Sequence, residues 1–259
     1  MANIKENNSV AEFWDEKYSE FDPNQKVDGN LFLANKSINL KDKKILIVAV
    51  GTGKEVVRAA RMGAEVYGID ISSNAVKNAE EMLKANNLNG NMIVGDAANT
   101  NFNNDFFDII WGCAVLHHLD HKKFSKELDK ILKKNGIALF VDEPTFFNPL
   151  IKFAYETLFG KGRVGRRRKF LFFTRRGDEF EKPIDYNDLS FYHKKFLIEK
   201  IPHHFMMFEK IAHAIFNWNK TIHRFFAKID FVIVKIMPFL KKYTYEYNFV
   251  FYSNKKNKI

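Results

Sequence analysis

Cysteine is almost absent from this chain of 259 residues, since Cys113 is the only one. A single thiol cannot form an internal disulfide, and no Cys/His cluster has the spacing of a zinc site, so we expect no structural metal. Long apolar runs are also lacking. The longest, Phe231 to Leu240, is interrupted by Lys235 and Pro238 and falls far below the ~20 residues that cross a bilayer. The sequence therefore predicts a protein held together by an ordinary hydrophobic core.

The first ten residues lack the apolar stretch of a secretory signal and carry Lys5 and Glu6, so we expect a cytoplasmic protein. The composition, 46% hydrophobic and 28% charged, is typical of a globular protein. The length favours one domain that carries a large insertion or cap.

Acidic residues are scarce in the second half of the chain. Residues 1–145 hold 18 Lys and Arg against 21 Asp and Glu, a balance of −3, whereas residues 146–259 hold 23 against 10, a balance of +13. A patch of one sign attracts opposite charge over long distances. The second half therefore suggests an anionic surface, substrate or polymer as partner, with a merely solvated basic face as the alternative.

From residue 44 onward, short apolar runs alternate with amphipathic stretches, which is typical of βαβ units on a parallel sheet. The expected strands are Ile45–Val50, Glu65–Asp70, Asn91–Gly95, Phe107–Gly112 and Ile137–Asp142. The expected helices between them are Lys54–Met62, Ser73–Ala85 and His121–Lys134.

Beyond Pro144 this alternation stops and the sequence becomes rich in Phe, Lys and Arg, which indicates an inserted cap over residues 145–186. After it we expect a helix over Tyr186–Phe196, an apolar helical stretch near Asp230–Leu240 and a closing strand near Tyr247–Ser253. Before the first strand, Phe13 to Tyr18 has aromatics at helical spacing.

Two motifs at strand ends point to a nucleotide-like ligand. Gly51-Thr52-Gly53 follows the first strand, where a glycine turn and a helix N-terminus let polar ligand atoms approach the backbone. Asp70 ends the second strand, where a carboxylate can accept both hydroxyls of a ribose. Either NAD or S-adenosylmethionine fits, although a structural turn and a helix-capping aspartate are the simpler alternatives.

A third pattern separates these cofactors. Gly95-Asp96-Ala97 ends the third strand, Phe107-Asp108 opens a fourth that runs into Leu116-His117-His118-Leu119, and Asn135-Gly136 leads to a strand ending Asp142-Glu143-Pro144. In this order, over residues 44 to 145, the chain resembles the class I S-adenosylmethionine-dependent methyltransferases, in particular the type-11 methyltransferase domain.

The resemblance implies a Rossmann-like α/β fold, with a mostly parallel seven-stranded sheet, its last strand antiparallel, and helices on both faces. The turn of Gly51 and Gly53 would pass under the methionine part of the cofactor, Asp70 would hold the ribose, and Asp96 would accept from the adenine amino group. The cofactor-binding residues implied are Ala49, Gly51, Gly53, Asp70, Ile71, Asp96, Ala97 and Cys113.

The chain departs from the family at two positions. Ile47 stands where the family often has an acidic residue, and Ala49 where it often has glycine. These changes permit a second interpretation, a non-catalytic scaffold that keeps the fold but binds the cofactor weakly or not at all.

Methyl transfer needs mainly orientation, because the sulfonium is already activated, and a general base is needed only when the acceptor must lose a proton. The candidates for such a base are His117, His118 and Glu143, all at the carboxyl edge of the expected sheet. Loop packing is the alternative for each.

The expected acceptor is a small metabolite, anionic or lipid-like, methylated on oxygen, nitrogen or carbon. Nucleic acid is a less favoured partner, because the fourth strand lacks the Asn/Asp-Pro-Pro-aromatic sequence of enzymes that methylate exocyclic base nitrogens. The apolar and basic C-terminal stretch could also lie on an anionic membrane surface, for example the inner face of the membrane. The expected organisation is a helical segment over 1–43 that closes over the cofactor, a cofactor-binding core over 44–144, the basic cap over 145–186, and completion of the sheet over 187–259.

Overall fold

The computed structural model describes residues 2–33, 37–159, 168–170, 173–175, 182–203, 208–209 and 220–253. Its first half alternates helices and strands as the apolar pattern predicts. In chain order the elements are α1 (Ala2–Lys17), β1 (Lys44–Val48), α2 (Lys54–Arg61), β2 (Glu65–Asp70), α3 (Ser73–Ala85), β3 (Asn91–Val94), β4 (Phe107–Cys113), η1 (Leu116–His118), α4 (His121–Ile131) and β5 (Leu132–Pro144).

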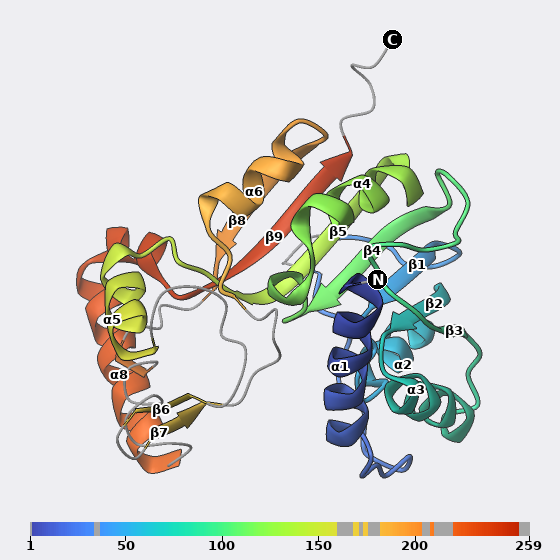
Figure 1. Cartoon of the computed structure of the whole chain (residues 1–259), viewed down its shortest axis with the longest axis horizontal. Coiled ribbons are helices and arrows are strands. Elements are labelled where there is room, and N and C mark those ends of the chain that lie inside the picture. Colours follow the sequence, from blue (N-terminus) through green and yellow to red (C-terminus); the bar gives the residue numbers. More distant parts are fainter. Residues whose placement is uncertain are drawn as a thin grey trace.

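The second half adds helices and completes the sheet. Its elements are α5 (Pro149–Phe159), β6 (Arg168–Phe170), β7 (Phe173–Arg175), α6 (Tyr186–His193), β8 (Phe196–Pro202), α8 (Lys220–Ile236), η2 (Pro238–Tyr243) and β9 (Glu246–Ser253). Figure 1 shows α5, α8 and the β6–β7 hairpin gathered on one side of the molecule, and α1, α2 and α3 on the other.

Seven strands form one sheet in the order β3-β2-β1-β4-β5-β9-β8. The pairs from β3 to β5 are parallel, and β9 runs antiparallel to both of its neighbours. The predicted fold class is thereby confirmed. Because β1, β2 and β4 are parallel, their carboxyl ends meet at one edge, where open α/β sheets bind ligands.

The core occupies both faces of this sheet, because β1 is buried on both sides. Leu46 and Val48 pack on one face with Phe124 and Leu128 of α4. Ile45 and Ile47 pack on the other face with apolar residues of α2 and α3. Ile47, the departure from the family pattern, therefore lies in a fully apolar environment with 0% of its surface exposed.

Several expected boundaries differ from the structure, two of them at the ends of helices. The helix expected over His121–Lys134 ends at Ile131, because Leu132 is fully buried and pairs with Phe107 as the first residue of β5. The helix expected over Tyr186–Phe196 ends at His193, and Phe196 begins β8. Tertiary pairing, which local propensity does not contain, determines both ends.

The structure describes part of the segment that the sequence predicts as a cap, residues 145–186. Its described elements are α5 and the β6–β7 hairpin, in which Arg168 pairs with Arg175. Arg163, Arg166 and Arg167 fall outside the described residues. Thr145 forms a β-bridge with Ile184, so the cap leaves and rejoins the body at one place.

The apolar stretch near the C-terminus forms α8, which ends before Pro238 because proline cannot continue the helical hydrogen bonding. Within the described part of the chain, no helix has the length and apolar character that would let it cross a membrane.

Candidate active site

A cavity of about 370 Å³ opens at the carboxyl edge of the parallel strands, a size suited to a small-molecule cofactor. Helix α1 and the segments that follow β1, β2, β3 and β4 supply its walls. The lining residues are Val10, Trp14, Tyr18, Val48, Ala49, Ile69, Asp70, Ile71, Gly95, Asp96, Ala97, Ala98, Cys113, Ala114, Val115, His118, Leu119, Asp120 and Lys123. Six of the eight expected cofactor residues line this cavity, and the other two, Gly51 and Gly53, lie in the turn behind it.

The turn after β1 depends on left-handed backbone. Gly51 and Gly53 have φ of 51° and 79°, and Ala49 has φ of 58° without being glycine. A Cβ on Gly53 would lie 2.7 Å from the backbone of Ala79 in α3, so only glycine allows this helix to approach the turn. Gly53 caps α2, whose first N–H groups face the end of β1.

Asp70 holds this turn to the end of β2. Its carboxylate accepts hydrogen bonds from the N–H of Gly51 at 3.1 Å and of Ser72 at 2.9 Å. Burial raises the pKa of Asp70, against the lowering effect of the N–H groups of Ser72, Gly51 and Ile71. A carboxylate offers about four acceptor positions, so the three N–H groups leave capacity for a ligand hydroxyl.

The loop after β3 presents Asp96 and Ala97 to the cavity. One carboxylate oxygen of Asp96 accepts from the N–H of Ala98 at 2.8 Å, which fixes the loop. Ala97 and Ala98 are small and buried, and leave space for a flat ring beside the carboxylate.

Two aromatic rings at the end of α1 cover the cavity, those of Trp14 in the helix and of Tyr18 directly after it. Trp14 stacks on Tyr18 with ring centroids 5.8 Å apart and meets His118 edge-on at 5.4 Å. Burial, followed by the charge of Asp70 and Cys113, raises the pKa of Tyr18 to about 12, so its hydroxyl stays protonated at neutral pH. Asp15, on the same helix, accepts hydrogen bonds from Ser72 and from the N–H of Asn74.

The end of β4 lies in an acidic environment. Cys113 lines the cavity, and its thiol is 3.6 Å from a carboxylate oxygen of Asp142. Burial raises the pKa of Cys113 far above its usual value, with further contributions from Asp142, Glu143 and Glu55. This end of the cavity favours a cationic ligand group.

The three candidate bases occupy different places. His118 lines the cavity, whereas Glu143 lies behind the loop with 0% exposed surface. Glu143 accepts from the N–H groups of Val115, Leu116 and His117 and contacts the His117 Nδ1 atom at 2.8 Å. His117 and Glu143 therefore form one buried pair, which holds in place the loop of residues 115–118 that carries His118.

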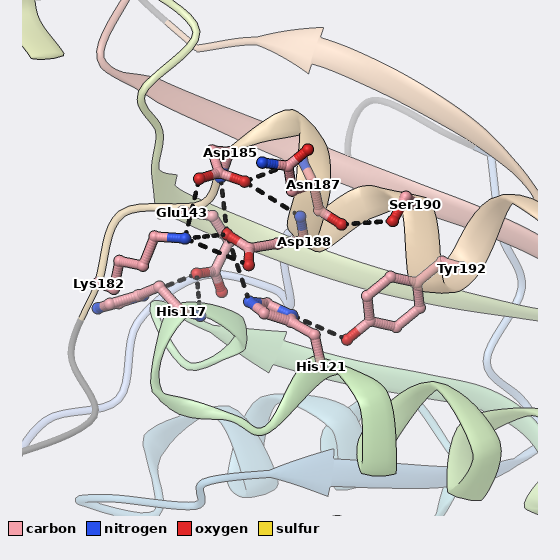
Figure 2. Close-up of polar contacts among 9 residues, drawn as sticks. All are labelled: His117, His121, Glu143, Lys182, Asp185, Asn187, Asp188, Ser190 and Tyr192. Carbon is pink, nitrogen blue, oxygen red and sulfur yellow. Dashed lines mark hydrogen bonds and ion pairs between the residues drawn. The ribbon is translucent and has the colours of Figure 1, made fainter. Parts of the chain in front are cut away.

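A second cluster of polar side chains, at residues 182–192, lies against this loop and the start of α4 (Figure 2). Lys182 pairs with Asp185 at 2.9 Å and Asp188 at 3.1 Å, while His121 meets the Tyr192 hydroxyl at 3.0 Å. The Lys182 N–H also donates to the carbonyl of His117. Burial lowers the pKa of His121, so the ring is neutral in the folded protein near pH 7.

Sequence reasoning missed two charged residues that line the cavity, Asp120 and Lys123, and one that holds α1 beside it, Asp15. Asp15 lies within the aromatic segment that was expected to form a helix, but nothing in that pattern separates its carboxylate from its exposed neighbours. Asp120 and Lys123 flank the start of α4, where an Asp before a helical pattern signals an N-cap and no ligand role.

Comparison with known proteins agrees with this geometry. Residues 46–140 match the family model described as a methyltransferase domain. The matched region runs from β1 to the middle of β5 and contains every strand end that lines the cavity. This part of the chain is therefore similar to that family, as the order of the sequence motifs predicts, and the activity and methyl donor are taken up as a proposal below.

Two curated relatives extend the comparison. A demethylmenaquinone methyltransferase from Geobacillus stearothermophilus is 33% identical over 114 residues, 41% of this chain and 49% of the relative. A ubiquinone biosynthesis O-methyltransferase from Pelagibacter ubique is 34% identical over 99 residues, 38% of this chain and 41% of the relative. The chain thus spans about half or less of the length of these relatives.

Solved structures agree with the fold. The crystal structure of the PH0226 protein from Pyrococcus horikoshii superposes with a TM-score of 0.52 at 20% identity, over 83% of each chain. The similarity to that protein therefore extends well beyond residues 46–140, into the part that completes the sheet.

Proposed function

We propose that this protein transfers a methyl group from S-adenosylmethionine to a small, lipid-like acceptor. The observation that carries the proposal is the convergence of Asp70 and Asp96 on one cavity, beside the glycine turn after β1. This arrangement suits a ligand with a ribose and an amino-bearing ring. It also agrees with the methyltransferase family of residues 46–140.

The residues present fit this donor. The remaining acceptor capacity of Asp70 suits a ribose hydroxyl, and the second oxygen of Asp96 suits an adenine amino group. The acidic surroundings of Cys113 suit the positive sulfonium. When bound, the cofactor supplies an activated methyl group, so the main work of the chain is to orient the acceptor and exclude water.

Two features support a lipid-like acceptor. One of the relatives above is named for demethylmenaquinone and the other for ubiquinone biosynthesis, and isoprenoid quinones are lipid-soluble. In addition, the cavity rim combines the rings of Trp14 and Tyr18 with a potential base, His118. His118 is the residue we propose to take a proton where the acceptor is a hydroxyl, and Glu143 with His117 would position it.

The basic C-terminal part supports a location at an anionic membrane surface, where such acceptors are found. Helix α8 exposes large apolar side chains next to lysines, a combination typical of helices that lie in a lipid interface. The exposed apolar residues of α8 and the turn after it are Phe225, Phe231, Val232, Ile236, Met237 and Phe239.

Calorimetric titration with S-adenosylmethionine, and separately with NADH, tests the donor. Asp96→Asn is the sharpest variant, because its amide oxygen can still accept from Ala98 while its NH₂ group would oppose an adenine amino group. We expect a loss of affinity of about tenfold or more, since leaving a polar ligand group without its partner costs about 1–3 kcal/mol. Asp70→Ala should abolish binding.

Glu80→Gln, an exposed change on α3, is the matched control and should bind the donor as the wild type does. Absence of binding at millimolar concentration in a folded wild-type protein would instead favour the scaffold interpretation that Ile47 and Ala49 permit. Binding of NADH in preference would contradict the proposal.

A further inference from the structure

Three side chains that are far apart in the sequence converge beside the donor cavity. Asp142 lies near the end of β5, His203 directly follows β8, and Glu246 begins β9. The His203 Nδ1 atom is 3.6 Å from Asp142 Oδ1 and 3.7 Å from Glu246 Oε2, and the candidate ligand atoms of the three residues all lie within 4.8 Å of one another.

The sheet fixes this arrangement from the backbone. The N–H of His203 donates to the carbonyl of Glu246 at 3.1 Å, and the N–H of Asp142 donates to the buried side chain of Asn248 at 2.9 Å. Asp142 has a left-handed φ of 57°, in the region where β5 and β9 shift register. The three side chains therefore start from positions that adjacent strands hold in place.

The candidate ligand atoms are spaced nearly as ligands of one cation are, within 4.8 Å of one another and with His203 3.6 and 3.7 Å from the two carboxylates. Ligands about 2.0–2.2 Å from one ion lie about 3–3.6 Å from each other. A small inward movement of the side chains would give that spacing.

The charge of the site also favours a cation. Two carboxylates face a single imidazole, and Glu55 and the Asp142–Cys113 contact add to the acidic side. The contact with the Glu246 carboxylate raises the pKa of His203, against burial and the charge of Lys241 on η2. The side chains of Asp142, His203 and Glu246 are 45%, 34% and 15% exposed, so an ion from solvent can reach them.

We propose that Asp142, His203 and Glu246 bind a divalent metal ion, Zn²⁺ or Mn²⁺. One imidazole nitrogen with two carboxylates suits these ions, whereas Mg²⁺ and Ca²⁺ prefer oxygen ligands alone. Three protein ligands leave open coordination positions for water or for a ligand oxygen. This site departs from the expectation, drawn from cysteine and histidine spacing, that the chain holds no metal.

The site adjoins the end of the cavity that Cys113 lines. Cys113 lines the cavity and its thiol is 3.6 Å from Asp142, so Cys113 would lie between an ion at this triad and the cavity. A role for the ion in holding an acceptor oxygen rests on the proposed function. Metal binding itself does not.

The test uses untagged, chelator-treated full-length protein. Calorimetric titration with Zn²⁺ and with Mn²⁺, and the shift of the thermal midpoint on adding each ion, measure binding without any methyl transfer. We expect Asp142→Asn, His203→Ala and Glu246→Gln each to weaken binding by about tenfold or more, because each removes one ligand. His193→Ala, an exposed histidine on α6, should leave binding unchanged.

The isosteric Asp142→Asn and Glu246→Gln keep the test valid should His203→Ala fail to fold. Binding that is equal in wild type and all folded triad variants would overturn the proposal, as would absence of binding by the folded wild type at millimolar metal. A parallel titration with S-adenosylmethionine separates the two proposals, since metal binding without donor binding contradicts only the proposed function.

Discussion

Asp15 on α1 accepts a hydrogen bond of 2.6 Å from the hydroxyl of Ser72, 57 positions later in the chain. The same carboxylate accepts from the N–H of Asn74 at 3.0 Å, in the first turn of α3. Burial acts to raise the pKa of Asp15, but the hydrogen bonds from Asn74, Ser72 and Ser73 outweigh it and lower the pKa below 3.8. Asp15 thus links α1, which covers the cavity, to the start of α3.

Asp15→Ala should release α1 from α3. We expect a loss of about 1 kcal/mol in the free energy of unfolding, as for other helix-cap carboxylates, together with weaker donor binding. Because the pKa of Asp15 is depressed, its contribution is present above pH 3.8 and is lost as the pH falls through the folded value. Hydrogen exchange of α1 and donor titration check this, and Glu12→Ala on an exposed position of α1 should change neither.

Ala49→Gly should stabilise the protein. Ala49 has a φ of 58°, a conformation that costs a residue with a Cβ about 1–2 kcal/mol and glycine very little. The greater freedom of glycine in the unfolded chain offsets part of this gain, so we expect a net increase of about 0.5–1 kcal/mol. Urea unfolding measures it. Ala59→Gly, inside α2, should instead destabilise by about 1 kcal/mol, and a loss of stability in Ala49→Gly would contradict the strained geometry.

Glu143→Gln should be costly for folding as well as for activity. The carboxylate is fully buried and accepts from three backbone N–H groups and from His117. Replacing one oxygen by an NH₂ group leaves buried donors facing each other, for which we expect a loss of about 2–4 kcal/mol. Chemical denaturation with Glu80→Gln as control tests this. Unchanged stability would contradict the role of these buried hydrogen bonds in holding the loop.

Acid should weaken the fold through His121. Its pKa is lowered, first by burial and against the charge of Asp188, so the unfolded chain takes up a proton near pH 6.5 that the folded protein does not. The contribution of His121 to stability is therefore complete above pH 6.5 and decreases as the pH falls from there toward the folded pKa. Unfolding of wild type and His121→Gln on either side of pH 6.5 measures the difference. A wild type that loses no more stability than the variant would contradict this assignment, and exposed His193→Gln should behave as the wild type.

The sequence predicts the donor half of the protein well because its signals are local. Continuous apolar runs such as 45–48 identify strands buried on both faces, and ligand residues at parallel strand ends must share one edge. Asp70 and Asp96 could therefore be assigned to one site before their contacts were known.

The remaining features depend on pairing between distant segments. Strand β8 alternates weakly and exposes Leu197 at 68%, so its sequence does not separate it from a loop or helix end. The triad of Asp142, His203 and Glu246 exists only because β5 and β8 end where the antiparallel strand β9 begins. No spacing within one segment indicates it.

The bond between Thr145 and Tyr245 has an evolutionary consequence. The Thr145 hydroxyl donates to the carbonyl of Tyr245 at 3.1 Å, 100 positions later, so the chain departs from β5 and returns to β9 at the same point of the sheet. The β-bridge between Thr145 and Ile184 closes off the segment between these two residues, which can therefore be lengthened, shortened or exchanged while α6 and β8 stay in place. This junction is therefore a position at which insertions can be exchanged between related proteins. In an engineered chimera, the same exchange could change the preference for the acceptor.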